Sequence, residues 1–165
     1  MIPIQYTQHS SPLGLLTLAS TDNGICGIYF PDQRNFRGTT EWQENHQQVH
    51  FKKVKQQLDA YFAGDLQQFN VPLDLTVYGT PFQQSVWEKL LTIRFGQTST
   101  YGQHAQQINK PRAVRAVGGA IGRNPISIIV PCHRVIGSNG ALTGYDGGLE
   151  RKKYLLKLEG FIKSD

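Results

Sequence analysis

Residues 131–135 read Pro-Cys-His-Arg-Val and are the part of the chain whose residue types are best suited to covalent chemistry. Cys132 directly precedes two basic side chains, His133 and Arg134, and a nearby positive charge stabilises a thiolate. This setting predicts a nucleophilic cysteine. The alternative is an inert cysteine following the apolar run at 126–130, the usual fate of a free cysteine in an apolar strand. Burying two basic side chains without a purpose would cost free energy, which favours the reactive interpretation.

Two further kinds of cysteine site compete with this interpretation. A zinc site needs several ligands at short spacing, and the second cysteine, Cys26, lies far from Cys132 in the chain. A cysteine hydrolase needs a base within reach of the thiol, but adjacent side chains of a strand point to opposite faces. Proton transfer from Cys132 to His133 would therefore need a turn or a bridging water. Both interpretations are disfavoured.

Glu159 is a second candidate for the site because of its position in the chain. Residues 149–158 predict a final helix that carries four basic side chains, and Glu159 follows at its C-terminal end. A negative charge there opposes the helix dipole. Such a carboxylate either faces solvent or has a partner, and an imidazole would suit it.

Basic and acidic residues are unevenly distributed along the chain. Residues 1–79 hold 5 Lys and Arg against 7 Asp and Glu, whereas residues 80–165 hold 12 against 5. From Lys89 to Tyr145, both included, there are seven basic residues and no acidic one. A stretch of one sign in a chain of net charge +5 indicates a face that binds a polyanion, with a solvated basic surface as the alternative.

Length and composition exclude several classes of protein. The 165 residues fit one domain or two small ones, and we expect a division into residues 1–79 and 80–165. With 39% hydrophobic residues the chain is expected to fold rather than to be disordered. We find no run of about 18 apolar residues for a membrane helix, no secretory signal and no disulfide framework. We therefore expect a cytoplasmic protein without membrane contact, and we also expect it to be a monomer.

In the first half, the sequence pattern predicts a hairpin and one helix. Residues 13–19 and 25–30 are strand-like, and Asp22-Asn23-Gly24 between them is typical of a hairpin turn. Apolar residues then recur at helical spacing from 51 to 62, and Gly64 follows as a stop signal.

Three helices are predicted in the basic half. Thr80-Pro81-Phe82-Gln83 combines an N-cap, a proline at the first helical position and a capping-box glutamine. Residues 100–103 repeat the capping box and open a short second helix. A third helix is predicted to begin at Pro111 and to continue to Ala120. Short helices joined by a turn on a basic background are typical of a helix-turn-helix DNA-binding unit.

The third helix predicts how DNA would be bound. Its exposed positions offer arginines and very small residues but none of the Asn, Gln or Ser side chains that pair with base edges. Small side chains let a helix approach either a neighbouring helix or the minor groove, which is only about 6 Å wide. In the groove, Arg115 would be the one long side chain able to enter the base stack. This interpretation implies binding that depends on shape and tolerates sequence.

Taken in order, these motifs resemble the O6-alkylguanine-DNA alkyltransferases, in particular their bacterial single-unit form. The motifs are Thr80-Pro81-Phe82-Gln83, Arg115-Ala116-Val117-Gly118-Gly119-Ala120, Asn124-Pro125, Pro131-Cys132-His133-Arg134-Val135, Gly144-Tyr145 and Leu155-Leu156…Glu159-Gly160. They span nearly all of residues 80–165, and the first half fits more loosely. The resemblance implies an α/β (α+β) fold. A small N-terminal domain of sheet and helix, ribonuclease H-like, would support a C-terminal helix-turn-helix, winged-helix-like domain.

The resemblance also implies catalytic roles for individual residues. Cys132 would take the alkyl group from guanine O6 in one displacement, with His133 bridged to it through water. Glu159 would hold the imidazole of His133. Asn124 would brace the turn before the active-site strand, and Tyr101 would donate toward guanine N3 and assist rotation of the nucleotide.

DNA contacts and a base pocket are implied in the same way. Arg115 would fill the gap left by the flipped base, which must leave the stack because its O6 substituent is otherwise out of reach. The other residues implied to contact DNA are Ala116, Gly118, Gly119, Arg123 and Arg134. The residues implied to form the base pocket are Tyr101, Val135 through its carbonyl, Tyr145 and Asp146. Because relatives usually have Ser or Ala at 146, and a carboxylate facing O6 would be repulsive, we expect the Asp146 side chain to point away and its N–H to contact O6.

The implied partner is double-stranded DNA containing O6-alkylguanine or O4-alkylthymine. Since an S-alkylcysteine is a stable thioether, the implied transfer is irreversible and happens once per molecule. No cofactor is expected, because the alkyl group arrives on the substrate, and no metal is expected, because the first half holds only Cys26. Three other functions stay open: a DNA-damage sensor without transfer, a winged-helix regulator that binds one operator, and a cysteine hydrolase that turns over esters or amides.

Overall fold

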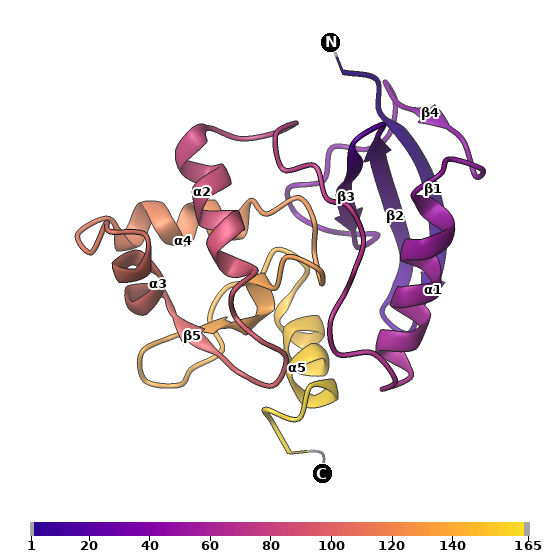
Figure 1. Cartoon of the computed structure of the whole chain (residues 1–165). Helices are drawn as coiled ribbons and strands as arrows, with labels where there is room; N and C mark the ends of the chain where they lie inside the picture. The colour runs from indigo at the N-terminus through magenta and orange to yellow at the C-terminus, as the bar shows by residue number, and fades with distance from the viewer. Residues whose placement is uncertain (1, 164–165) are drawn as a thin grey trace.

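A four-stranded sheet forms the N-terminal half of the molecule, whose computed structural model describes residues 2–163 (Figure 1). Strands β1 (Gln5–Ser11), β2 (Gly14–Thr21) and β3 (Gly24–Tyr29) are antiparallel neighbours. The short β4 (Gln43–Glu44) pairs parallel to β1, so that the strand order is β3-β2-β1-β4. Helix α1 (Phe51–Phe62) packs against this sheet. The fold is therefore mixed α and β, as the resemblance implies.

The predicted hairpin and the helix at 51–62 are confirmed, whereas strand β1 is an addition to the prediction. Its sequence, Gln-Tyr-Thr-Gln-His-Ser-Ser, is too polar to show an apolar strand pattern. The strand is fixed by its seven-residue ladder with β2 and by the burial of Thr7. Because such pairing joins separate segments, a local sequence pattern does not reveal it.

The C-terminal half holds the remaining helices. They are α2 (Pro81–Leu90), α3 (Tyr101–Gln107), α4 (Val114–Gly122) and α5 (Leu149–Leu158), with a 3-10 turn at Cys132–Arg134. Strands β5 (Ser99–Thr100) and β6 (Val135–Ile136) form a small parallel pair. Both capping boxes are present: the Thr80 side chain accepts from Gln83 N at 3.2 Å, and the Thr100 side chain accepts from Gln103 N at 3.1 Å. These two predicted helix starts are confirmed.

One predicted helix start and one expected strand in this half are wrong. The third helix begins at Val114 and not at Pro111, because the chain first makes a turn in which Ala113 N donates to Lys110 O at 2.9 Å. Residues 126–130 do not form an extended strand but a buried turn, in which Val130 N donates to Ile126 O at 3.0 Å. Apolar residues suit both a buried strand and a buried turn, so their composition does not distinguish the two.

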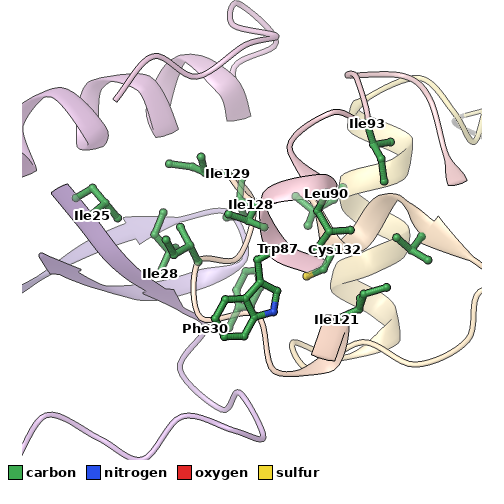
Figure 2. Packing of buried hydrophobic residues seen from close by; sticks show 14 of the residues in the cluster. Ile25, Ile28, Phe30, Trp87, Leu90, Ile93, Ile121, Ile128, Ile129 and Cys132 are labelled. Carbon is green, nitrogen blue, oxygen red and sulfur yellow. The ribbon is translucent and has the colours of Figure 1, made fainter. Parts of the chain in front are cut away.

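The two halves share one hydrophobic core. Ile28 of β3 forms a parallel bridge with Ile126: Ile28 N donates to Pro125 O at 2.9 Å, and Ser127 N donates to Ile28 O at 3.2 Å. Figure 2 shows the isoleucines of β3 beside those of the 126–130 turn, with Trp87 of α2 and Cys132 in the same cluster. The N-terminal sheet therefore fixes the position of the segment that leads into Cys132. No helix within residues 2–163 is long and apolar enough to span a membrane.

Candidate active site

The turn before Cys132 is held by a single asparagine. Asn124 Nδ2 donates to Val130 O at 2.8 Å, and Asn124 Oδ1 accepts from Ile126 N at 3.0 Å, so the side chain spans both ends of the turn. Within the turn, Ile128 adopts a φ of +75°, which is unfavourable for a β-branched residue. This strained backbone persists because Asn124 and the surrounding core determine its position. These contacts are the ones expected of the bracing residue that the resemblance implies.

Cys132 belongs to the hydrophobic cluster (Figure 2) and is only 6% exposed. Burial raises the pKa of its thiol to about 11, and the Asn124 amide and the charge of Lys152 offset part of this rise. The predicted thiolate stabilisation by His133 and Arg134 is wrong. Burial lowers the pKa of His133, and the charge of Arg134 is paired with Glu159. The resting site therefore holds a protonated thiol that must lose its proton before it can attack.

Glu159 is the centre of a buried network of hydrogen bonds. It is 4% exposed, and its carboxylate accepts from His133 Nε2 at 2.8 Å and from the Tyr61 hydroxyl at 2.5 Å. Arg134 binds it through two nitrogens, Nε at 2.7 Å and Nη2 at 3.0 Å. Hydrogen bonds and opposite charge outweigh burial here and lower the pKa of Glu159 to about 2. The imidazole partner expected for Glu159 is present, and it lies inside the protein.

Two residues of this network differ from the expectation. Arg134 is buried, and its third nitrogen donates to Ile93 O at 2.6 Å, so the prediction that it contacts DNA is wrong. Its guanidinium compensates the charge of Glu159 instead. The sequence pattern assigns Tyr61 only to the apolar face of α1, yet its hydroxyl reaches across to Glu159, which lies 98 residues away in the chain. The only sequence signal for this contact is the residue type, because a tyrosine places a polar hydroxyl at a helix position that faces the core.

The tautomer of His133 follows from these contacts. A neutral imidazole carries one N–H, and donation from Nε2 to Glu159 leaves Nδ1 as an acceptor. Within residues 2–163, Nδ1 is buried and has no hydrogen-bond partner. The structure gives no direct hydrogen bond between this ring and the Cys132 thiol among the described residues. Nδ1 is therefore the ring atom available as a proton acceptor, and the water bridge to Cys132 that the resemblance implies stays a prediction.

A cavity of about 280 Å³ reaches Cys132. Its walls include Tyr101 at the start of α3, Gly118 and Gly119 of α4, and Tyr145. The structure thus gathers the predicted acceptor, the predicted small-residue helix and three of the four predicted pocket residues around one space. Val135 is the exception, because it does not line the cavity. The remaining lining residues are Arg34, Asn35, Ile121, Gly122, Arg123, Gly144 and Asp146.

The two tyrosines of the cavity differ in their hydrogen bonding. Tyr101 donates its hydroxyl to Thr143 O at 2.9 Å, so donation to a bound base would require this bond to be exchanged. Tyr145 packs edge-on against Phe30, directly after β3, with ring centroids 6.2 Å apart. Its hydroxyl is buried and has no partner within residues 2–163.

Lys152 is a functional candidate that the sequence analysis missed. Its side chain is fully buried, and Nζ donates to Val135 O at 2.6 Å, to Thr143 O at 3.0 Å and to Gly144 O at 3.1 Å. Burial lowers its pKa to about 8. As one of four basic residues on the last helix it gives no signal of its own. The Val135 carbonyl expected to face the base is therefore already bound by Lys152.

The surface of α4 beside the cavity is basic and has small side chains. Arg115, Ala116 and Gly119 are exposed, and Gly118 is half-buried, where a β-carbon would lie 3.6 Å from the Tyr101 ring. Arg123 follows at the end of α4, is exposed and lines the cavity. A partner that lies along this helix would thus reach the opening that leads to Cys132.

Metal-type ligands do not cluster in the described part of the chain: no group of three or more His, Cys, Asp or Glu side chains is placed there to hold an ion. Cys26 is buried within β3, and burial raises the pKa of its thiol to about 12. It behaves as the small buried residue that the sequence predicted.

Fold and site together define a two-part protein in which a buried cysteine, Cys132, lines a cavity beside the small residues of α4. Residues 4–75 match the family described as 6-O-methylguanine DNA methyltransferase, ribonuclease-like domain, and residues 81–161 match its DNA binding domain. The chain belongs to the 6-O-methylguanine DNA methyltransferase family.

Individual relatives are similar over nearly the whole chain. The methylated-DNA–protein-cysteine methyltransferase of Mycolicibacterium paratuberculosis is 51% identical over 94% of this chain and 92% of its own length. The enzyme of the same name from Haemophilus influenzae is 44% identical over 96% of this chain and 88% of its own length. The crystal structure of Mycobacterium tuberculosis OGT in complex with DNA superposes with a TM-score of 0.85 at 49% identity. That match covers 94% of this chain and 92% of the other.

Proposed function

We propose that this protein repairs alkylated DNA by transferring the alkyl group to its own Cys132. The observation that carries the proposal is the position of Cys132 at the end of a cavity beside α4, next to an imidazole that Glu159 holds. The names of the relatives support this activity, since they are methylated-DNA–protein-cysteine methyltransferases. The DNA complex of the M. tuberculosis OGT supports DNA as the partner.

The residues of the site suit a single displacement. The Cys132 thiol gives its proton to His133 Nδ1 through a water, and Glu159 stabilises the imidazolium that forms. The sulfur then attacks the alkyl carbon at guanine O6, the carbon–oxygen bond breaks, and its electron pair stays on the guanine. The displaced proton finally reaches the guanine ring, so that the products are unmodified guanine and an S-alkylcysteine. Because the thioether is stable, the alkyl group stays on Cys132 and each protein molecule acts once.

Base flipping belongs to the proposal because a base must leave the DNA stack before it can enter the cavity. The opening lies beside α4, whose small residues allow close approach to a minor groove. O4-alkylthymine is included as a second substrate, since it presents the same alkyl–oxygen bond at a similar position of the ring.

The finer organisation is proposed as follows. The chain divides into residues 1–79 and 80–165, since the two family matches lie on either side of this boundary. It is proposed to act as a monomer, since Cys132, His133 and Glu159 meet within a single chain and the transfer needs no second copy. It works in the cytoplasm, and the two free thiols, Cys26 and Cys132, suit a reducing compartment.

The direct test is the intact mass of the protein after mixing with a slight excess of duplex that contains one O6-methylguanine. We expect one added methyl group per molecule, not exceeded with time, and none in Cys132→Ala. A Cys26→Ala variant is the matched control and should still accept one methyl group. Selective binding of the damaged duplex without a mass change would support a damage sensor instead. Neither selectivity nor a mass change would favour the operator-binding regulator.

Replacing Arg115 by alanine is expected to slow transfer from duplex DNA about tenfold. Flipping a base costs a few kcal/mol, and a side chain that fills the gap recovers part of this cost. Transfer from a free O6-alkylguanine base should be unchanged, because that substrate needs no flipping. Arg112→Ala, another exposed arginine just before α4, is the control for loss of charge alone. Equal slowing in both variants would contradict the assigned role of Arg115.

A further inference from the structure

The Asp146 carboxylate is bound by a residue of the N-terminal half. Asn35 lies in the loop between β3 and β4; its backbone N donates to Asp146 Oδ2 at 3.1 Å, and its Nδ2 donates to Oδ1 at 2.7 Å. The same Nδ2 donates to Gly122 O, at the end of α4, at 3.2 Å. Arg34 N also donates to Asp146 O at 3.3 Å. One short loop thus connects the cavity wall at Asp146 with the end of the helix beside the opening.

This connection lies at the cavity that leads to Cys132. Arg34, Asn35, Gly122 and Asp146 all line that cavity together with the acceptor cysteine. Its volume of about 280 Å³ is at or below the lower end for pockets that enclose small molecules, roughly 300–1,000 Å³. In a cavity of this size, a larger O6 substituent comes closer to the walls than a methyl group does.

Among the walls, the part that carries Asn35 is exposed, so it can shift without opening the buried core. Arg34 and Asn35 are exposed, whereas Cys132 and Ile121 belong to the buried core. The loop is held here by hydrogen bonds to Asp146 and Gly122, and hydrogen bonds at exposed positions contribute modestly. Two of these hydrogen bonds are accepted by the Asp146 carboxylate, and bonds to a charged acceptor are stronger than bonds between neutral groups.

We propose that the contact between Asn35 and Asp146 is a latch that determines which O6 substituents the protein accepts. This inference rests on the proposed alkyl transfer to Cys132. With the latch closed, a methyl group fits, and a bulky group must first break the hydrogen bonds that hold the loop. Asp146 thereby favours small substituents through a residue of the other half of the chain. The same contact explains how a carboxylate is accommodated in this wall.

The test compares transfer from duplexes with O6-methylguanine and O6-benzylguanine in one competition, so that effects on DNA affinity cancel. Asn35→Ala removes the side-chain donor, and Asn35→Asp places two carboxylates against each other. Both should raise the benzyl-to-methyl rate ratio at least fivefold. The double variant Asn35→Asp/Asp146→Asn exchanges the two groups, so that the amide at 146 donates to the carboxylate at 35. It should return the benzyl-to-methyl ratio toward the wild-type value. Gln47→Glu, an exposed change of equal charge in the same half, should leave the ratio unchanged.

A second readout separates the latch from the proposed function. Cys132 is alkylated with iodoacetamide and with the bulkier N-phenylmaleimide, and peptide mapping gives the rate of each at that cysteine. The Asn35 variants should raise the ratio of the bulky to the small reagent, whether or not DNA is a substrate. A raised ratio without any transfer from DNA would retain the latch and refute the function. Normal transfer with both ratios unchanged in every Asn35 variant would overturn the latch.

Discussion

A Glu159→Gln variant is expected to lose about 3 kcal/mol or more of its free energy of unfolding and most of its transfer activity. Removing one partner of a buried ion pair leaves the other charge uncompensated, which costs roughly 3–5 kcal/mol. Here the uncompensated group is Arg134, which is buried and bound to both oxygens of Glu159. The glutamine also weakens the hydrogen bond that orients His133, so the thiol loses its proton acceptor.

Urea unfolding and the second-order rate of transfer measure these two effects. Glu150→Gln is the matched control: the same change in the first turn of the same helix, at an exposed side chain. The variant at 159 should also differ in its response to acid. The pKa of Glu159 is about 2 in the folded protein against an ordinary 4.5, so its contribution is complete above about pH 4.5 and is lost as the pH falls toward 2. A loss no larger than that of Glu150→Gln would contradict the network.

Replacing Lys152 by methionine is expected to slow transfer at least tenfold, with a change in the free energy of unfolding below about 2 kcal/mol. Methionine has a similar length and avoids the cost of burying an ammonium, which offsets the lost hydrogen bonds. The rate suffers for two reasons. The variant loses the positive charge that stabilises the Cys132 thiolate, and it frees the Val135, Thr143 and Gly144 carbonyls that Lys152 holds together.

The pH dependence of the rate identifies the part that is due to charge. Because the pKa of Lys152 is about 8, its ammonium is present below that pH and is lost above it. The ratio of the wild-type rate to the Lys152→Met rate should therefore be largest below about pH 8 and should narrow above it. Lys153→Met, its exposed neighbour on α5, should match the wild type throughout. A ratio that does not change with pH would assign the role of Lys152 to packing alone.

The sequence predicts those features that depend on neighbouring residues. Each capping box lies within four residues, so Thr80 and Thr100 are sufficient to locate two helix starts. The hairpin and the spacing of α1 are equally local. The order of motifs from Thr80 to Gly160 is specific enough to indicate the family by itself.

Contacts between distant segments are the part that the sequence does not predict. The sequence suggests that Arg134 binds DNA or stabilises the thiolate. Its actual partner, Glu159, lies 25 residues further along the chain, and no sequence pattern pairs the two. Tyr61 and Asn35 reach the site from the other half of the chain, over 98 and 111 residues. Burial of the thiol also reverses the expected direction of its pKa, and burial depends on the whole fold.

The bridge between Ile28 and Ile126 has a consequence for how the molecule responds to change. Since the edge strand of the sheet pairs with the turn before Cys132, and Tyr61 pairs with Glu159, the two halves are not independent modules. A substitution that loosens the sheet would therefore change the position of the Cys132 sulfur, even though it lies away from the DNA-binding surface. For the same reason, exchanging one half with that of a relative would succeed only if β3, α1 and their partners were exchanged together. The two halves are therefore expected to change together in evolution.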